Sequence, residues 1–184
     1  VSTFHAACVR ILRAQAEHIG YPKTFSIYDQ SDSTRLVGYC IRDLGLDPKR
    51  FTPRGVQARI SLWKNELVIP HDAASLVDNS IDAKHVDVYR EYQKRLERAG
   101  AMDFDDLLTN TVRLFRQHPD VLRTYQERFK HILIDEYQDT NMAQNEIVLL
   151  LGALHHNVCV VGDTDQSVYR FRGADFRNIM QFEN

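Results

Sequence analysis

Acidic and amide side chains follow two short apolar stretches of this 184-residue chain. Asp135 and Glu136 come directly after residues 131–134, and Gln166 lies in the polar segment after residues 158–162. One carboxylate in such a position can hold Mg²⁺, usually through its water shell, while its neighbour orients or deprotonates a water that attacks a phosphoryl group. A nearby glutamine is suited to contact the terminal phosphate. Together these residues indicate nucleotide hydrolysis. Taken without Gln166, Asp135 and Glu136 could instead be carboxylates that only cap the following helix.

The two apolar stretches are predicted to be strands, because they are short and rich in β-branched residues. Residues 143–154 between them carry a helical apolar pattern, so the sequence predicts a strand–helix–strand unit with parallel, buried strands and a right-handed crossover. In an open parallel sheet, ligands bind beyond the carboxyl ends of the strands. We therefore expect the two acidic segments to meet at one edge of the sheet.

The rest of the chain reads as helical. Apolar spacing and capping residues predict helices over residues 5–19, 30–44, 53–67 and 80–99, so that residues 26–103 are expected to be entirely helical. Val1 to Phe4 reads as the end of a strand. Asp103 caps a further helix, and we interpret the acids at 103–106 as helix caps rather than as metal ligands.

Composition restricts the class of protein. The chain is 43% hydrophobic and 26% charged, with a net charge of −2, 8 glycines and 5 prolines, which excludes fibrous and wholly disordered chains. No apolar run approaches the roughly 20 residues that cross a bilayer. The three cysteines (Cys8, Cys40 and Cys159) are far apart and form no C-x-x-C pair, so we expect no zinc site or disulfide framework and a reducing, intracellular compartment.

Basic residues are concentrated in two regions of the helical part. Between residues 42 and 64 they outnumber the acids, and a second group follows at residues 94–98. Lysines and arginines clustered on one face can contact a phosphate backbone, but a solvated helix surface has the same composition. The sequence leaves both interpretations open for Arg42, Lys49, Arg50, Arg54, Arg59, Lys64, Lys94, Arg95 and Arg98.

Four segments resemble the UvrD/PcrA/Rep family of superfamily 1 DNA helicases, in the order of that family's motifs and at similar spacing. The last two correspond to its motifs II and III, and the resemblance covers essentially the whole chain. The segments are residues 2–5 (STFH), 103–107 (DFDDL), 134–141 (IDEYQDTN) and 161–175 (VGDTDQSVYRFRGAD).

The resemblance implies an α/β fold: a partial P-loop NTPase (RecA-like) parallel sheet with a mostly helical inserted subdomain. Residues 1–25 would form a strand and helix of motor subdomain 1A, residues 26–103 the helical insert 1B, and residues 104–184 the rest of 1A. It implies the cofactors ATP and Mg²⁺, with Asp135 as the magnesium-associated carboxylate, Glu136 as the water-activating base and Gln166 as the sensor of the γ-phosphate.

The resemblance also implies a single-stranded DNA track on which aromatic rings stack against bases. Two positions depart from the family pattern. Phe171 stands where Trp is common, which gives a smaller stacking face, and Ala6 stands where Ser is usual. The residues assigned to the track are Phe4, Tyr169, Phe171 and Arg172.

No G-x-x-x-x-G-K-[ST] phosphate-binding loop occurs in the chain. The resemblance therefore implies an interior fragment of a bacterial 3′–5′ DNA helicase, inactive as an ATPase on its own. Its expected partners are single-stranded DNA, a single-strand/duplex junction and the remainder of the helicase, in a cytoplasmic, nucleoid-associated location with no membrane contact. Two alternatives stay open: the motor portion of a helicase–nuclease, or an isolated, non-catalytic DNA-binding module.

Overall fold

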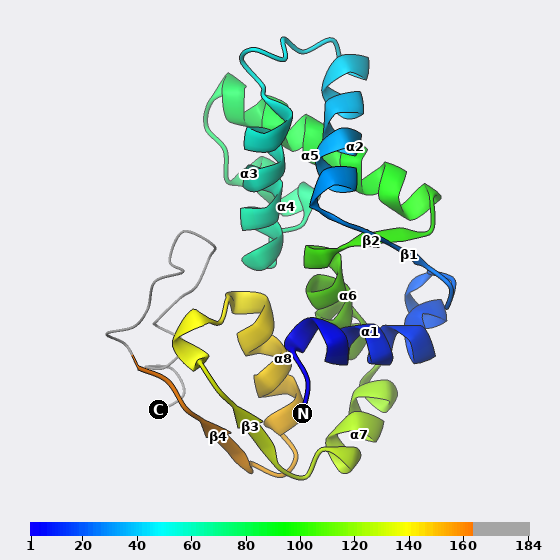
Figure 1. Cartoon of the computed structure of the whole chain (residues 1–184), viewed down its shortest axis with the longest axis vertical. Coiled ribbons are helices and arrows are strands. Elements are labelled where there is room, and N and C mark those ends of the chain that lie inside the picture. Colours follow the sequence, from blue (N-terminus) through cyan, green and yellow to red (C-terminus); the bar gives the residue numbers. More distant parts are fainter. Residues whose placement is uncertain (164–184) are drawn as a thin grey trace.

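In the computed structural model, which describes residues 1–163, two groups of helices are joined by a pair of short parallel strands (Figure 1). The chain begins with α1 (Phe4–Gln15) and the 3-10 helix η1 (Ala16–Ile19). The upper group of helices in Figure 1 is enclosed between the strands β1 (Ser26–Tyr28) and β2 (Ala101–Asp103). It consists of α2 (Gln30–Asp43), α3 (Pro53–Asn65), α4 (Pro70–Ser75) and α5 (Ser80–Arg98).

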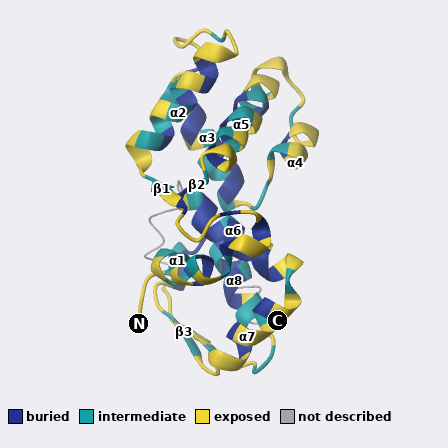
Figure 2. Cartoon of the chain, turned by 90° about the vertical axis from the view of Figure 1, so that its right-hand side faces the viewer, coloured by how far each residue is buried: buried dark blue, intermediate teal, exposed yellow. Residues whose placement is uncertain are grey.

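The lower group contains α1 and the elements that follow β2. The helix α6 packs against α1, α3, α7 and α8, and Figure 2 shows buried residues along it. This central position explains its eight buried residues, which include polar ones. The elements are α6 (Phe104–Gln117), α7 (Pro119–Arg128), β3 (Ile132–Ile134), the 3-10 helix η2 (Tyr137–Asp139), α8 (Met142–Gly152) and β4 (Val158–Val160).

Each group of helices has its own hydrophobic core. The lower core unites side chains from α1, α6 and α8, including Leu12, Phe115 and Ile147. The upper core is built from α2, α3 and α5 around Trp63 and Tyr92. The two described cores meet where β1 and β2 join the groups, so these strands mark both the entry to and the exit from the upper group.

The predicted strand–helix–strand unit is confirmed. β3 pairs in parallel with β4 in the register Ile132↔Val158 and Ile134↔Val160, and α8 connects them. Asn141 begins α8 with a capping box, in which its side chain accepts from the backbone N–H of Gln144. The α/β class is therefore correct, although helices predominate.

Two predictions about the first hundred residues are wrong. Residues 26–103 are not entirely helical, because β1 pairs in parallel with β2 in the register Ser26↔Ala101. Phe4 does not end a strand: it is the first residue of α1, and the Thr3 side chain caps this helix by accepting from the backbone N–H of Ala6 at 3.2 Å. No strand lies within residues 1–25.

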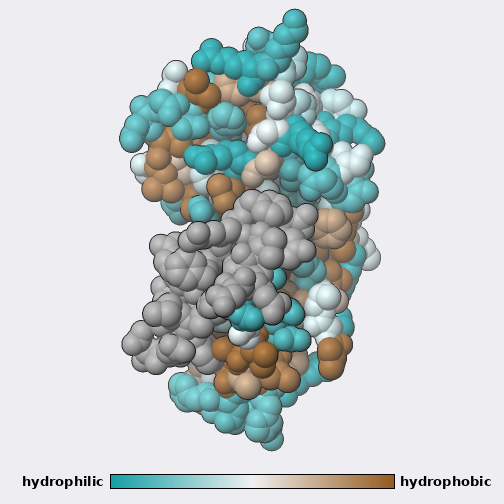
Figure 3. Space-filling view, turned by 60° about the vertical axis from the view of Figure 1, so that its left-hand side comes forward, coloured by the Kyte–Doolittle hydropathy of each residue, from teal (hydrophilic) through white to brown (hydrophobic). Residues whose placement is uncertain are grey.

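The prediction that β3 is buried is also wrong for one of its faces. Leu133 is 71% exposed, and its register partner Cys159 is exposed as well. Successive side chains of a strand point to opposite faces of the sheet, and within the described chain the face that carries Leu133 and Cys159 is not covered. Figure 3 brings this side of the molecule forward and shows hydrophobic side chains on its lower surface.

Among the described residues, no helix is both long and apolar enough to span a membrane.

Candidate nucleotide-binding edge

The two strand-end segments meet at one edge of the β3–β4 sheet, as predicted. Backbone hydrogen bonds continue the pairing beyond the strands: the N–H of Val161 donates to the carbonyl of Ile134 at 2.8 Å, and the N–H of Tyr137 donates to the carbonyl of Val161 at 2.9 Å. Between these bonds Asp135 and Glu136 leave the sheet, and both residues are exposed. The carboxylates are therefore accessible at the carboxyl edge, where ligands of parallel sheets bind.

Gln138 holds the two segments together. Its side chain is 1% exposed, its Nε2 donates to the Glu136 carboxylate, and its Oε1 accepts from the backbone N–H of Asp163 at 3.0 Å. A Cβ atom at Gly162 would lie 2.6 Å from this Oε1, so any other residue here would displace the Gln138 amide from its present position. The sequence analysis assigned no role to Gln138. The only feature that could have indicated one is that Gln138, like Gln166, follows the end of a predicted strand.

The backbone at Glu136 is in the left-handed region, with φ 53° and ψ 41°. This conformation is uncommon for a residue with a Cβ atom, and such positions persist where the surroundings determine them. Here Tyr137, which is fully buried, anchors the chain by donating its hydroxyl to Asn145 of α8. The N–H of Glu136 donates to Oδ1 of Asp135 at 3.0 Å, so the two neighbouring acids have a defined mutual arrangement.

The chemistry of this edge is compatible with magnesium. Within residues 1–163 no three histidine, cysteine, aspartate or glutamate side chains converge in a way that could hold a metal ion. Mg²⁺ is commonly bound by one or two carboxylates together with water and substrate phosphates. An exposed Asp135 at the end of a strand fits that mode of binding.

Of the remaining predicted site residues, the structure describes Phe4 alone. Phe4 lies at the start of α1, where it is partly buried against the lower core. The other positions lie outside the described residues: Gln166, Tyr169, Phe171 and Arg172.

Comparison with known protein families decides the relationship. The family described as the UvrD/REP helicase N-terminal domain matches residues 1–184. The chain belongs to this family. The resemblance deduced from the motif segments is thereby confirmed.

Relatives of this UvrD/REP helicase domain align over its full length. The chain is 46% identical over 183 residues to the ATP-dependent DNA helicase PcrA of Bacillus subtilis (strain 168), covering 100% of the chain and 25% of that protein. It is 51% identical over 194 residues to the ATP-dependent DNA helicase UvrD1 of Mycobacterium tuberculosis (strain H37Rv), with the same coverage of 100% and 25%. The chain thus spans about a quarter of the length of these relatives.

A second charged cluster of the UvrD/REP helicase domain lies at the junction of the two cores. Lys64 of α3 donates from Nζ to Asp103 Oδ2 at 2.7 Å and to Asp106 Oδ1 at 2.8 Å. From α5, the Tyr92 hydroxyl donates to Asp103 Oδ2 at 2.7 Å, and Gln93 Nε2 donates to Asp106 Oδ1 at 3.2 Å. This Lys64 cluster therefore connects both helix groups by hydrogen bonds.

The assignment of Lys64 to a basic surface is wrong, because the residue is only 2% exposed. The capping interpretation of Asp103 and Asp106 is correct: they form a capping box at the start of α6. Burial raises the pKa of Asp106 to about 7, and the Asp103 charge adds to the effect. Burial alone would lower the pKa of Lys64, but the Asp103 and Asp106 charges outweigh it and hold that pKa well above its usual value.

Asp106 should make stability depend on pH. Its pKa of about 7 in the folded state lies above its ordinary value of 3.8, so its contribution to stability is fully present below about pH 4 and is lost as the pH rises through 7. We expect the free energy of unfolding to fall between pH 5 and pH 7 by about 1–2 kcal/mol more in the wild type than in Asp106→Asn. Urea unfolding at several pH values measures this difference.

The matched control for this experiment is Asp120→Asn, which removes an exposed carboxylate from α7. It should leave the pH profile of the wild type unchanged. Parallel profiles for the wild type and Asp106→Asn would contradict the raised pKa.

Proposed function

We propose that this chain is part of an ATP-dependent 3′–5′ DNA helicase and that Asp135 and Glu136 act on its nucleotide. The observation that carries the proposal is the pair of exposed carboxylates at the carboxyl edge of a parallel strand pair. Two lines of support are the family to which the chain belongs and whole-chain relatives whose names are ATP-dependent DNA helicases.

In this proposal the two acids divide the work. Asp135 would hold Mg²⁺, which when bound neutralises charge on the phosphates. Glu136 would accept a proton from the attacking water, and the hydrogen bond from Gln138 to its carboxylate restricts where that group can lie. Gln138 also accepts a hydrogen bond from the backbone N–H of Asp163. A movement of the segment that leads from Asp163 to Gln166 would therefore also move Gln138, and with it the Glu136 carboxylate.

The DNA track in this proposal consists of Phe4, Tyr169, Phe171 and Arg172. Phe4 supports it only in part, because its ring is shared between solvent and the lower core. Stacking of a base on each aromatic ring of the track would contribute about 1–3 kcal/mol. Gln166 would link the γ-phosphate to this track.

We further propose the division into motor subdomain 1A, residues 1–25 and 104–184, and the insert 1B, residues 26–103. The separate upper and lower cores support this division. The 1A part would be a portion of a P-loop NTPase sheet, completed by polypeptide that supplies the phosphate-binding loop and the second motor domain. Such a protein would work on chromosomal DNA in the bacterial cytoplasm.

Two other functions remain as alternatives to this proposal: a helicase–nuclease and a non-catalytic DNA-binding module. The names of the PcrA and UvrD1 relatives favour the helicase. Phosphate release in the presence of ATP, Mg²⁺ and single-stranded DNA tests the choice. We expect turnover that depends on DNA from the whole protein containing this segment, and none from the 184-residue chain. A whole protein that binds DNA without hydrolysing ATP would instead support the non-catalytic module.

A further inference from the structure

The start of α8 is built around one amide side chain, that of Asn141. This residue is 8% exposed and lies just after the 3-10 helix η2. Its Oδ1 accepts from the backbone N–H of Gln144 at 2.8 Å, and its own backbone N–H donates to the Gln144 side chain at 3.0 Å. Because Oδ1 serves as the helix cap, the orientation of the amide is determined, and Nδ2 is left to donate elsewhere.

Asn65, the last residue of α3, accepts this donor. The Asn141 Nδ2 donates to Asn65 Oδ1 at 2.8 Å, between residues that are 76 positions apart in the sequence. The bond is partly buried, and a hydrogen bond shielded from water is electrostatically stronger than one at the surface. It joins a helix of the upper group to the chain that follows the candidate nucleotide-binding edge.

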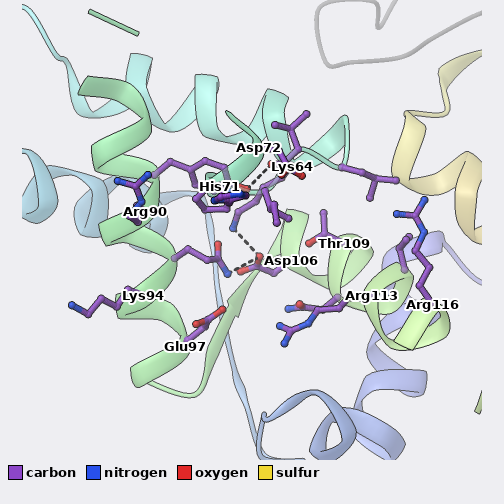
Figure 4. Close-up of a pocket in the computed structure, with 18 of the residues that line it drawn as sticks. Lys64, His71, Asp72, Arg90, Lys94, Glu97, Asp106, Thr109, Arg113 and Arg116 are labelled. Carbon is purple, nitrogen blue, oxygen red and sulfur yellow. Dashed lines mark hydrogen bonds and ion pairs between the residues drawn. The ribbon is translucent and has the colours of Figure 1, made fainter. Parts of the chain in front are cut away.

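The acceptor is itself held in place. The preceding residue, Lys64, donates to Asp103 and Asp106, and Figure 4 shows the Lys64 side chain reaching Asp106 at the start of α6. The Asn65 Nδ2 donates to Ser61 Oγ at 3.4 Å, one turn earlier on α3. The end of α3 is thus attached to the lower group at two points, which are the starts of α6 and α8.

Further hydrogen bonds connect Asn141 to the acids of the edge. The Thr140 hydroxyl donates to the carbonyl of Tyr137 at 2.7 Å, and the Tyr137 hydroxyl donates to Asn145 of α8. These bonds attach η2 to the first turns of α8, so a displacement of Asn141 would move η2 with it. Glu136 adjoins η2 directly, as its N-cap residue.

Asp135 is held in a different way. It follows β3, whose last residue, Ile134, accepts from the backbone N–H of Val161 at 2.8 Å. Strand pairing fixes this end of β3 independently of η2. The hydrogen bond between Asn65 and Asn141 should therefore affect the position of Glu136 more than that of Asp135.

We propose that Asn65 is a positioning residue for Glu136 that acts through Asn141, so that the upper helix group contributes to hydrolysis at the edge. This inference rests on the proposed function of Glu136 as the base. Loss of the hydrogen bond should slow the chemical step, because a displacement of about 1 Å at the reacting groups can cost on the order of 10²-fold in rate. Nucleotide binding through Asp135 should change little.

Steady-state ATP hydrolysis by the whole protein, at saturating single-stranded DNA, tests the inference. Asn65→Leu removes the acceptor at similar volume, and Asn141→Ser keeps a capping oxygen on a side chain too short for the bond to Asn65. Each substitution should lower kcat at least about fivefold, with the KM for ATP within about twofold of the wild type. The double variant should be at most about twofold slower than the slower single variant, because both substitutions remove the same bond.

The matched control is Gln30→Met, which removes a hydrogen bond between two amides within the upper group alone, from Gln30 Nε2 to Gln57 Oε1 at 2.6 Å. Its kcat should stay within about twofold of the wild type. The inference fails if Asn65→Leu keeps the wild-type kcat, if only its KM changes, or if the effects of the two single substitutions multiply in the double variant.

The substitution Glu136→Gln separates this failure from failure of the proposed function. If Glu136→Gln loses kcat and Asn65→Leu does not, the positioning role of Asn65 alone is overturned. If Glu136→Gln itself keeps the wild-type kcat, the proposed function fails and the inference fails with it.

Discussion

The substitution Glu136→Gln, in the whole protein that contains this segment, is expected to lower kcat for DNA-stimulated ATP hydrolysis by about 10²–10⁴-fold. The amide cannot accept a proton from the attacking water, which is the role proposed for this carboxylate. The KM for ATP should change little, because the residue would act in the chemical step rather than in holding the nucleotide. Steady-state phosphate release at saturating single-stranded DNA measures both constants.

The control for this experiment is Glu127→Gln, the same chemical change at an exposed position of α7. Its kcat should match that of the wild type. A Glu136→Gln enzyme with more than about a tenth of the wild-type kcat would refute the assignment of Glu136 as the general base.

The substitution Lys64→Met is expected to lower the free energy of unfolding of the 184-residue chain by about 3–5 kcal/mol. Methionine fills a similar volume but leaves the carboxylates of Asp103 and Asp106 buried without their cation. It also removes hydrogen bonds that join α3 to β2 and α6. Urea unfolding followed by circular dichroism at pH 8 measures the change.

Lys49→Met is the matched control, because Lys49 is exposed and precedes α3. Its effect on the free energy of unfolding should stay within about 0.5 kcal/mol. If Lys64→Met also stayed within that limit, the Lys64 cluster would contribute nothing net to the junction of the two cores.

Local patterns were sufficient where neighbours in the sequence determine the structure. The β-branched residues of β3 and β4, with α8 between them, predicted the parallel pair and the edge at which Asp135 and Glu136 emerge. The capping box of Asp103 and Asp106 was likewise visible in a spacing of three residues. These features depend on interactions over a few residues or on one short crossover.

Long-range partners explain what sequence reasoning missed. β1 and β2 have three residues each, and Ser26 finds its partner Ala101 only across the whole upper helix group. Lys64 is four residues after the buried Ile60 and thus on the inner face of α3, but its carboxylate partners lie 39 and 42 residues further on. The exposure of Leu133 depends on what packs against that face of the sheet, which an apolar run does not reveal.

We propose that a magnesium nucleotide binds beside Asp135, and iron-directed cleavage of the whole protein is the test of this claim. Fe²⁺ replaces Mg²⁺ in the presence of ADP; added hydrogen peroxide and ascorbate then let the bound iron produce hydroxyl radicals that cut the nearest backbone. Mass spectrometry should place the cuts within residues 134–138 and 161–163, and Asp135→Asn should abolish them. Cuts confined to other segments, or unchanged in Asp135→Asn, would contradict the claim.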